Sequence, residues 1–244
     1  MSAEALNSQE PPGGPGFYGK LPIRGDFLSR RLPLAYTQAW DVWMQESIAS
    51  SRERLHDRWL DCYLTSPVWR YLINDARLGE GAFAGVLIPS VDQVGRYFPF
   101  LISAQVHHRE NLFHLLVRGT SWFDAAELTA LEALNQNVDI DELDNRIRDL
   151  GYPDFDHDWT PLELGQSTSL PWRLPLRATD RIGELMPAVA EHLFRERFSD
   201  FSLWWTNGSR QVEPTLVVYS GLPPTTDFAS LMTGEWEPVR GDAE

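Results

Sequence analysis

Two groups of charged side chains have the types and spacing that could do chemistry. Asp92 and Arg96 stand four residues apart, in a bend between two apolar runs. An earlier stretch, Gly16–Pro33, also mixes acidic and basic residues at short spacing. Its candidates are Lys20, Arg24, Asp26 and Arg30. Partly buried pairs of this kind can shift pKa values, so acid–base chemistry or anion binding is one function open to them.

The alternative role for these charges is structural. Ion pairs between the two stretches would pin two turns together, and removing one member of a buried pair costs roughly 3–5 kcal/mol. We favour this interpretation, with the binding of a partner as a second use of the same surface.

Two other motifs lack the context that their chemistry requires. Gly14–Gly19 matches the G-x-G-x-x-G dinucleotide pattern, but a Pro-rich segment precedes it where a strand is needed. Asp154–Asp158 resembles the first half of a calcium loop, but Trp159 and Gly165 replace the required Gly and Glu. No G-x-S-x-G or local Cys/His nucleophile signature occurs. We therefore expect no catalytic residue, no cofactor and no metal ion.

The elements that position the charged groups can be predicted from hydrophobic periodicity. The apolar runs Ala82–Ile88 and Phe98–Val106 predict buried strands on either side of the bend, and Phe17–Ile23 predicts a first strand. A helix is predicted from Leu32 to Ser51, because Tyr36, Trp40 and Trp43 recur at three- and four-residue spacing.

The rest of the chain alternates helical and extended patterns. Further helices are predicted over Arg52–Tyr63, Ser121–Asn135, Asp139–Leu150 and Arg181–Phe198. In the helix over Ser121–Asn135, we expect Ser121 to be the N-cap. The side chains expected to face the core there are Ala125, Leu128, Leu131 and Leu134. Asn207-Gly208 predicts a hairpin between strands Phe201–Trp205 and Thr215–Tyr219. Val68–Asn74 and Leu112–Arg118 fit a strand or a helix equally well.

Together these elements predict a single α/β domain. We expect a mixed, largely antiparallel sheet with helices on both faces, plus a C-terminal helix and hairpin extension. The expected organisation is a disordered tail (1–15), a core module (16–138), an acidic helix and Pro-rich loop (139–180), a helix and strands completing the same domain (181–222), and a second tail (223–244).

Composition restricts the partners and the compartment. The 244 residues carry a net charge of −14, which disfavours nucleic acid as a partner. Cys62 is the only cysteine, so an internal disulfide and a Cys-based zinc site are excluded. The first residues have no basic segment followed by an apolar one, and no run of about 18 apolar residues occurs. We expect a cytoplasmic protein that does not span a membrane.

Three stretches together resemble the TagF/ImpM family associated with bacterial type VI secretion. They are GFYGKLPIRGDFLSRRLP (16–33), PSVDQVGRYFPF (89–100) and SLWWTNG (202–208). The resemblance covers the chain from about residue 16 to 220. The family-signature positions with an expected interaction role are Lys20, Arg24, Asp26, Arg30, Ser90, Asp92, Arg96, Trp204 and Trp205.

The resemblance implies a non-enzymatic accessory or regulatory protein of the secretion system. Some family members repress secretion after translation through a forkhead-associated scaffold protein, so the implied partners are cytosolic secretion components. Forkhead-associated domains commonly bind phosphothreonine followed by Asp three residues later, and no threonine here has that neighbour. Contact through a folded surface is therefore the simpler expectation.

Two other functions remain open at the level of the sequence. One is a small-anion sensor or enzyme that uses Asp26, Arg30, Asp92 and Arg96. The other is a structural subunit of the secretion apparatus.

Overall fold

The structure, a computed structural model, describes residues 14–106, 112–153 and 182–236, with side chains of the last range described from Met186 onward. The strands are β1 (Gly16–Gly19), β2 (Leu28–Arg30), β3 (Trp69–Asn74), β4 (Ala82–Ile88), β5 (Phe100–Val106), β6 (Phe201–Thr206) and β7 (Thr215–Tyr219). The helices are α1 (Leu34–Leu55), α2 (Trp59–Leu64), α3 (Leu112–Arg118), α4 (Thr120–Ala133), α5 (Ile140–Asp149), α6 (Ile182–Arg197) and α7 (Phe228–Thr233).

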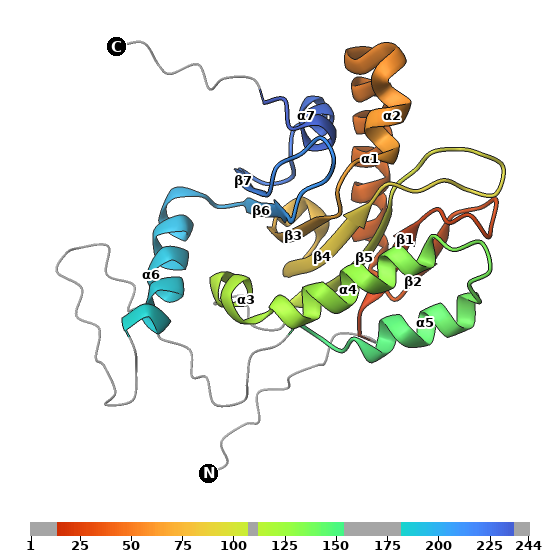
Figure 1. Cartoon of the computed structure of the whole chain (residues 1–244). Coiled ribbons are helices and arrows are strands. Elements are labelled where there is room, and N and C mark those ends of the chain that lie inside the picture. The colour runs from red at the N-terminus through yellow and green to blue at the C-terminus, as the bar shows by residue number, and fades with distance from the viewer. Residues whose placement is uncertain (1–13, 107–111, 154–181, 237–244) are drawn as a thin grey trace.

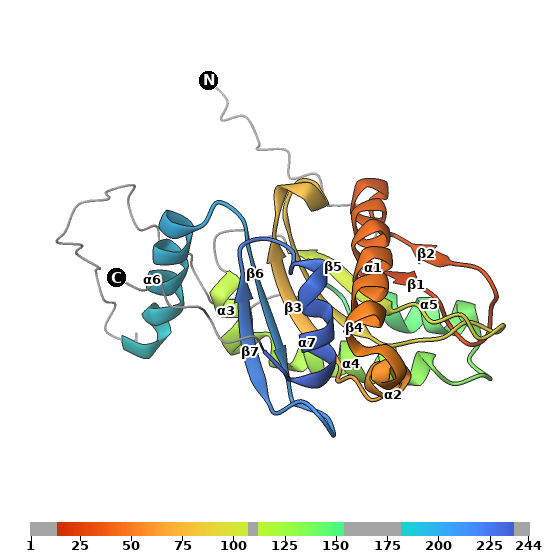
Figure 2. The same cartoon turned by 90° about the horizontal axis from the view of Figure 1, so that it is seen from above.

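One seven-stranded sheet organises the described residues, in the order β2-β1-β5-β4-β3-β6-β7. All of its pairings are antiparallel. Helices α1, α2 and α7 lie on one face and α3, α4 and α5 on the other (Figures 1 and 2). The predicted single α/β domain with helices on both faces is confirmed.

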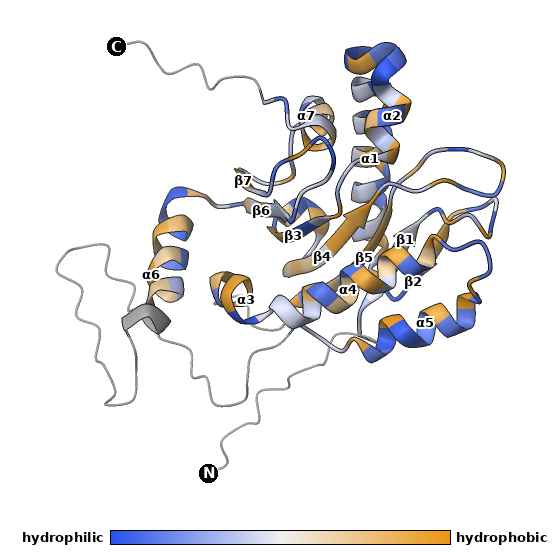
Figure 3. Cartoon of the chain, in the orientation of Figure 1, coloured by the Kyte–Doolittle hydropathy of each residue, from blue (hydrophilic) through white to orange (hydrophobic). Residues whose placement is uncertain are grey.

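The central strands are apolar throughout because both of their faces are covered. All seven residues of β4 are buried, and Figure 3 shows this strand in the hydrophobic colour. The predicted bounds of β4 are those observed. Strand β5 begins at Phe100 rather than Phe98, because Pro99 lacks the N–H that a ladder bond needs.

The first core face is dominated by aromatic side chains on α1. Tyr36, Trp40 and Trp43 are at most 5% exposed, as their spacing predicts. The Trp40 ring lies 5.2 Å from Tyr71 of β3 and 6.0 Å from Trp204 of β6. The helix therefore lies across β3 and β6, which are far apart in the sequence.

The second core face shows that the predicted stripe of α4 was wrong. The helix begins at Thr120 with Gly119 at its N-cap and no side-chain cap, so Ser121 does not cap it. Leu128 and Leu131 are 57% and 46% exposed. The buried positions are Trp122, Phe123, Ala126, Thr129, Ala130 and Ala133. Two aromatic rings anchor this face, and small alanines let the helix approach β4 closely.

Tertiary contacts decide the two segments that the sequence left open. Trp69–Asn74 forms β3, because β4 and β6 pair with it on both sides. Leu112–Arg118 forms α3 and buries Leu112 and Leu115, which are three residues apart.

The C-terminal part differs from the expected tail. Within it, α7 is buried at all six positions. The indole N–H of Trp43 donates to the Pro223 carbonyl at 2.7 Å, and that of Trp69 donates to the Leu231 carbonyl at 3.0 Å. Residues 223–236 thus complete the first core face, which the sequence did not reveal because the α7 segment is only six residues long.

Most of the expected N-terminal tail and Pro-rich loop, residues 1–13 and 154–180, lies outside the described residues. Between them, α5 forms as predicted, with Leu143 and Ile147 buried. Arg31 ties this helix to the start of the domain: its guanidinium donates to Asp144 Oδ1 at 2.5 Å and to the Pro15 carbonyl at 2.8 Å.

Candidate interaction site

A buried ion pair joins the two charged stretches. Lys20 follows β1, and Asp92 lies in the connection between β4 and β5. Lys20 Nζ is 2.8 Å from Asp92 Oδ2, and their side chains are 7% and 0% exposed. The same carboxylate accepts from Arg96 Nε at 2.6 Å and from the backbone amides of Val94 and Arg96 at 3.0 and 2.8 Å. These donors occupy both carboxylate oxygens.

These contacts determine the ionisation of Asp92. Burial by itself raises the pKa of a carboxyl group. Here the hydrogen bonds from Lys20, from the Arg96 backbone and guanidinium, and from the Val94 amide outweigh burial and hold the pKa of Asp92 well below its usual range. Asp92 is therefore ionised at neutral pH in the folded protein.

Backbone contacts close the junction between the two stretches. Ser90 Oγ donates to the Lys20 carbonyl at 2.7 Å, and the Gln93 amide donates to the Arg24 carbonyl at 3.1 Å. The Arg96 guanidinium also donates to the Gly25 carbonyl. We call Lys20, Ser90, Asp92 and Arg96 the charged centre.

The local sequence explains why the Asp92–Arg96 bend is tight. The Asp92 amide donates to the Arg96 carbonyl, and the Gly95 amide donates back to the Asp92 carbonyl, both at 3.0 Å. Gly95 has φ of 87°, a conformation that glycine adopts without steric cost. Val91 and Tyr97 form a bridge across the base of the bend.

An aromatic cluster covers one side of the charged centre. Lys20 Nζ lies 4.8 Å from the centre of the Phe27 ring, a distance typical of a cation–π contact. Phe27 stacks on Tyr18 at 5.8 Å and meets Phe98 edge-on at 4.8 Å. Phe27 is 45% exposed, so the cluster extends from the core to the surface.

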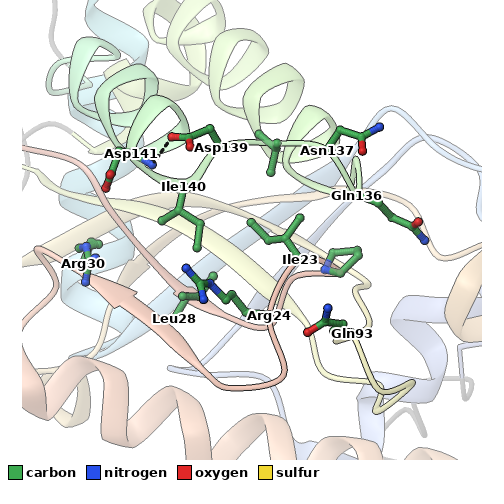
Figure 4. Close-up of a pocket in the computed structure, with 12 residues that line it drawn as sticks. Ile23, Arg24, Leu28, Arg30, Gln93, Gln136, Asn137, Asp139, Ile140 and Asp141 are labelled. Carbon is green, nitrogen blue, oxygen red and sulfur yellow. Dashed lines mark hydrogen bonds between the residues drawn. The ribbon is translucent and has the colours of Figure 1, made fainter.

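An open hollow of about 680 Å³ lies beside the charged centre, and we call it the groove (Figure 4). Both signature stretches contribute to it, together with the α4–α5 connection. Its lining residues are Pro22, Ile23, Arg24, Leu28, Arg30, Gln93, Gln136, Asn137, Val138, Asp139, Ile140 and Asp141. Figure 4 shows the arginines and Leu28 on the β1–β2 side, Asp139 and Asp141 on the α5 side, and Ile23 and Ile140 between them.

The two arginines of the groove are exposed and form no ion pair with the described residues. Arg24 and Arg30 are exposed, and no carboxylate of the described residues forms an ion pair with either. Asp139 differs, because its carboxylate accepts from the amides of Asp141 and Glu142 and caps α5. The groove thus has a basic wall without a carboxylate partner among the described residues, an apolar floor, and an acidic wall partly engaged in the fold.

The structure brings together only part of the predicted set. Lys20, Ser90, Asp92 and Arg96 form the charged centre, and Arg24 and Arg30 line the groove beside it. Asp26 is exposed, and none of the described residues pairs with its carboxylate.

The two tryptophans lie elsewhere on the sheet. Trp204 is fully buried next to Trp43 and Tyr71, and its indole N–H donates to Ser202 Oγ at 2.9 Å. Trp205 points to the opposite face and meets Phe123 edge-on at 4.7 Å. Both residues belong to β6, and each packs against a different core face.

Sequence reasoning missed the third side of the groove, residues 136–141. The one local signal is Asp139, an N-cap residue followed by two acids in the first turn of α5. That signal predicts where the helix begins but not that the loop before it folds back beside β2.

Two kinds of feature are missing from the part of the chain that the structure describes. No three His, Cys, Asp or Glu side chains gather there as a metal site. None of the helices there combines the length and the apolar character needed to cross a membrane. The calcium-like run Asp154–Asp158 lies outside the described residues.

Comparison with known proteins gives a consistent result. Residues 16–150 match the family described as TagF N-terminal domain, type VI secretion system-associated. Among solved structures, PA0076 from Pseudomonas aeruginosa PAO1 is 34% identical over 92% of this chain and 96% of its own, with a TM-score of 0.78. No curated protein sequence matches the chain significantly.

Proposed function

Because this chain belongs to the TagF family of type VI secretion-associated proteins, we propose that it is a cytoplasmic, non-enzymatic regulator of that system. In this proposal it represses secretion after translation by binding a forkhead-associated scaffold protein. The groove is the proposed contact site.

The observation that carries the proposal is that the two signature stretches have buried inner residues and exposed outer residues. Their inner residues form the charged centre, where Asp92 is fully buried and all of its partners belong to the chain itself. Their outer residues, Arg24, Arg30 and Gln93, line an open groove instead. A buried centre that supports an exposed surface suits a binding protein better than an enzyme.

The anion-sensor alternative fits this geometry less well. It requires Asp26, Arg30, Asp92 and Arg96 to face one ligand. Asp92 is enclosed, whereas Asp26 and Arg30 are exposed. The four groups therefore do not share a cavity among the described residues.

The test is binding of the intact protein to the purified scaffold of the same secretion system, measured by isothermal titration calorimetry. Replacing Arg24 and Arg30 together by Ala should weaken binding at least about tenfold, because the groove then loses both of its basic side chains. A tenfold change in the dissociation constant corresponds to about 1.4 kcal/mol. The matched control is Arg197→Ala, an exposed arginine on α6, outside the groove. It should bind as the intact protein does.

A secretion assay in cells separates regulation from mere binding. Deleting the gene should raise secretion, and the Arg24→Ala/Arg30→Ala variant should behave like the deletion. Unchanged secretion on deletion would contradict the regulatory role. Unchanged binding by the double variant would contradict the groove as the contact site.

A further inference from the structure

The two edges of the sheet differ in how they are protected. An exposed edge strand offers unpaired backbone groups to any other strand, and proteins usually protect it by shortening it or placing charges on it. β2 follows this rule: it has three residues, includes Arg30, and is followed at once by Arg31 with φ of 55°. β7 does not follow it.

β7 is an uncharged and regular edge strand of five residues, Thr215–Tyr219. It pairs with β6 on one side over its whole length. No hydrogen bond from its other side to any described residue is present. Figure 2 shows β7 as the outermost strand at its end of the sheet.

One face of β7 carries apolar side chains that the described helices leave uncovered. Leu216 is 54% exposed and Val218 is 41% exposed. Leu216 lies opposite Trp205 in the ladder, and Val218 lies opposite Leu203. Val217 and Tyr219 point to the other face and pack against the first core. Leu216, Val218 and the partly exposed Trp205 form what we call the β7 ledge.

We propose that β7 pairs antiparallel with β7 of a second copy of this chain, so that two sheets join into one. A two-fold axis at Val217 pairs Thr215 with Tyr219 and Leu216 with Val218 of the other copy. Each exposed apolar side chain then faces another one on the same face of the sheet, as a self-complementary interface requires. This dimer is independent of the groove and of the proposed scaffold contact.

Charge does not oppose the pairing of two copies at β7, although it does elsewhere on the surface. Each chain carries a net charge of −14, so two copies repel each other over most approaches. β7 has no charged residue, and the pairing places no like charges opposite each other within the strand. Since the remaining repulsion is screened by salt, dimerisation should strengthen as ionic strength rises.

Analytical ultracentrifugation of the intact protein over a range of concentrations tests the proposal. We expect a monomer–dimer equilibrium whose dissociation constant rises at least about tenfold in Leu216→Lys and in Val218→Lys, because an inserted charge protects an edge strand. Leu128→Lys is the matched control: Leu128 is 57% exposed on α4, and the substitution should leave the equilibrium unchanged.

Hydrogen exchange identifies the surface in the unmodified chain. Amides of residues 215–219 should exchange more slowly as protein concentration rises, whereas amides of 28–30 at the other edge should not respond. A monomer at every concentration would overturn the proposal, and so would a dimer that both lysine variants form as well as the intact chain does. Circular dichroism of the variants confirms that a lost dimer is not lost folding.

Discussion

At the scale of single residues, Asp92 and Asp26 show how burial divides two aspartates with similar sequence contexts. Each lies within four residues of an arginine in a turn. Asp92 accepts hydrogen bonds from a lysine, an arginine and two amides, whereas Asp26 has no such partner among the described residues. The same chemical change should therefore have different effects at the two positions.

Replacing Asp92 by Asn should destabilise the protein by roughly 3–5 kcal/mol, because Lys20 then stays buried without a counter-charge. At about 2–4 °C per kcal/mol for a chain of this size, Tm should fall by roughly 6–20 °C. Asp26→Asn is the matched control, and a change of at most about 0.5 kcal/mol is expected for an exposed site. Thermal melts followed by circular dichroism measure both; equal Tm values would contradict a structural role for Asp92.

Acid should weaken the same contact. The pKa of Asp92 is depressed in the folded state, so its stabilisation is fully present above the unfolded pKa of about 3.9 and is lost as pH falls through the lower folded value. The difference in stability between the intact protein and Asp92→Asn should narrow below about pH 4. Urea melts at several pH values measure it, and a constant difference would contradict this linkage.

At the scale of elements, Gly85 in the middle of β4 permits a close fit between strands. A methyl group on its Cα would overlap the Tyr71 hydroxyl and the Ile102 carbonyl. That hydroxyl is 3.0 Å from Tyr36 Oη, which in turn is 2.7 Å from Ser103 Oγ. The glycine thus makes room for a buried polar network that joins α1 to β3 and β5.

Replacing Gly85 by Ala should cost about 1–3 kcal/mol, as expected for overpacking. Gly25→Ala is the matched control, since nothing lies within 4 Å of the added methyl group there. Urea denaturation measures the two free energies of unfolding. If the Gly85 variant were as stable as the Gly25 variant, the close fit around Gly85 would be contradicted.

The sequence predicts an element well where a single hydrophobic pattern runs along it. It does not where two patterns are compatible with the sequence and tertiary contacts determine which face is buried. The continuous apolar run of β4 and the aromatic stripe of α1 are buried as their patterns indicate. α4 has apolar residues on more than one side, so periodicity alone did not show that Trp122 and Phe123 set its buried face. Likewise, the proximity of Lys20 to Asp92 could be hypothesised, whereas the groove depends on how the α4–α5 loop folds back.

At the scale of the whole molecule, the two ends of the described chain meet on one face of the sheet. α7 packs on α1, and Phe228 meets Trp43 edge-on at 5.7 Å. The first core face therefore includes side chains from Tyr18 to Met232. The domain therefore needs α7 to cover Trp43 of α1.

A chain that ends at Leu222 should lose cooperative folding. It lacks the buried side chains of Phe228, Leu231 and Met232, each worth about 1.5–3 kcal/mol on burial, against a typical total stability of about 5–15 kcal/mol. A chain that ends at Trp236 retains α7 and is the reference. Thermal melts and tryptophan emission distinguish the two, and matching cooperative melts would contradict the role of α7.

The burial of Lys20 also affects how the surface can be mapped chemically. Lys20 is the only lysine in the sequence, and it is 6% exposed with its amine bonded to Asp92. Amine-directed cross-linkers and labels therefore find no lysine on the described surface, neither at the groove nor at the β7 ledge. Carboxylate-directed reagents suit this protein better, because acidic side chains are numerous and many of them are exposed.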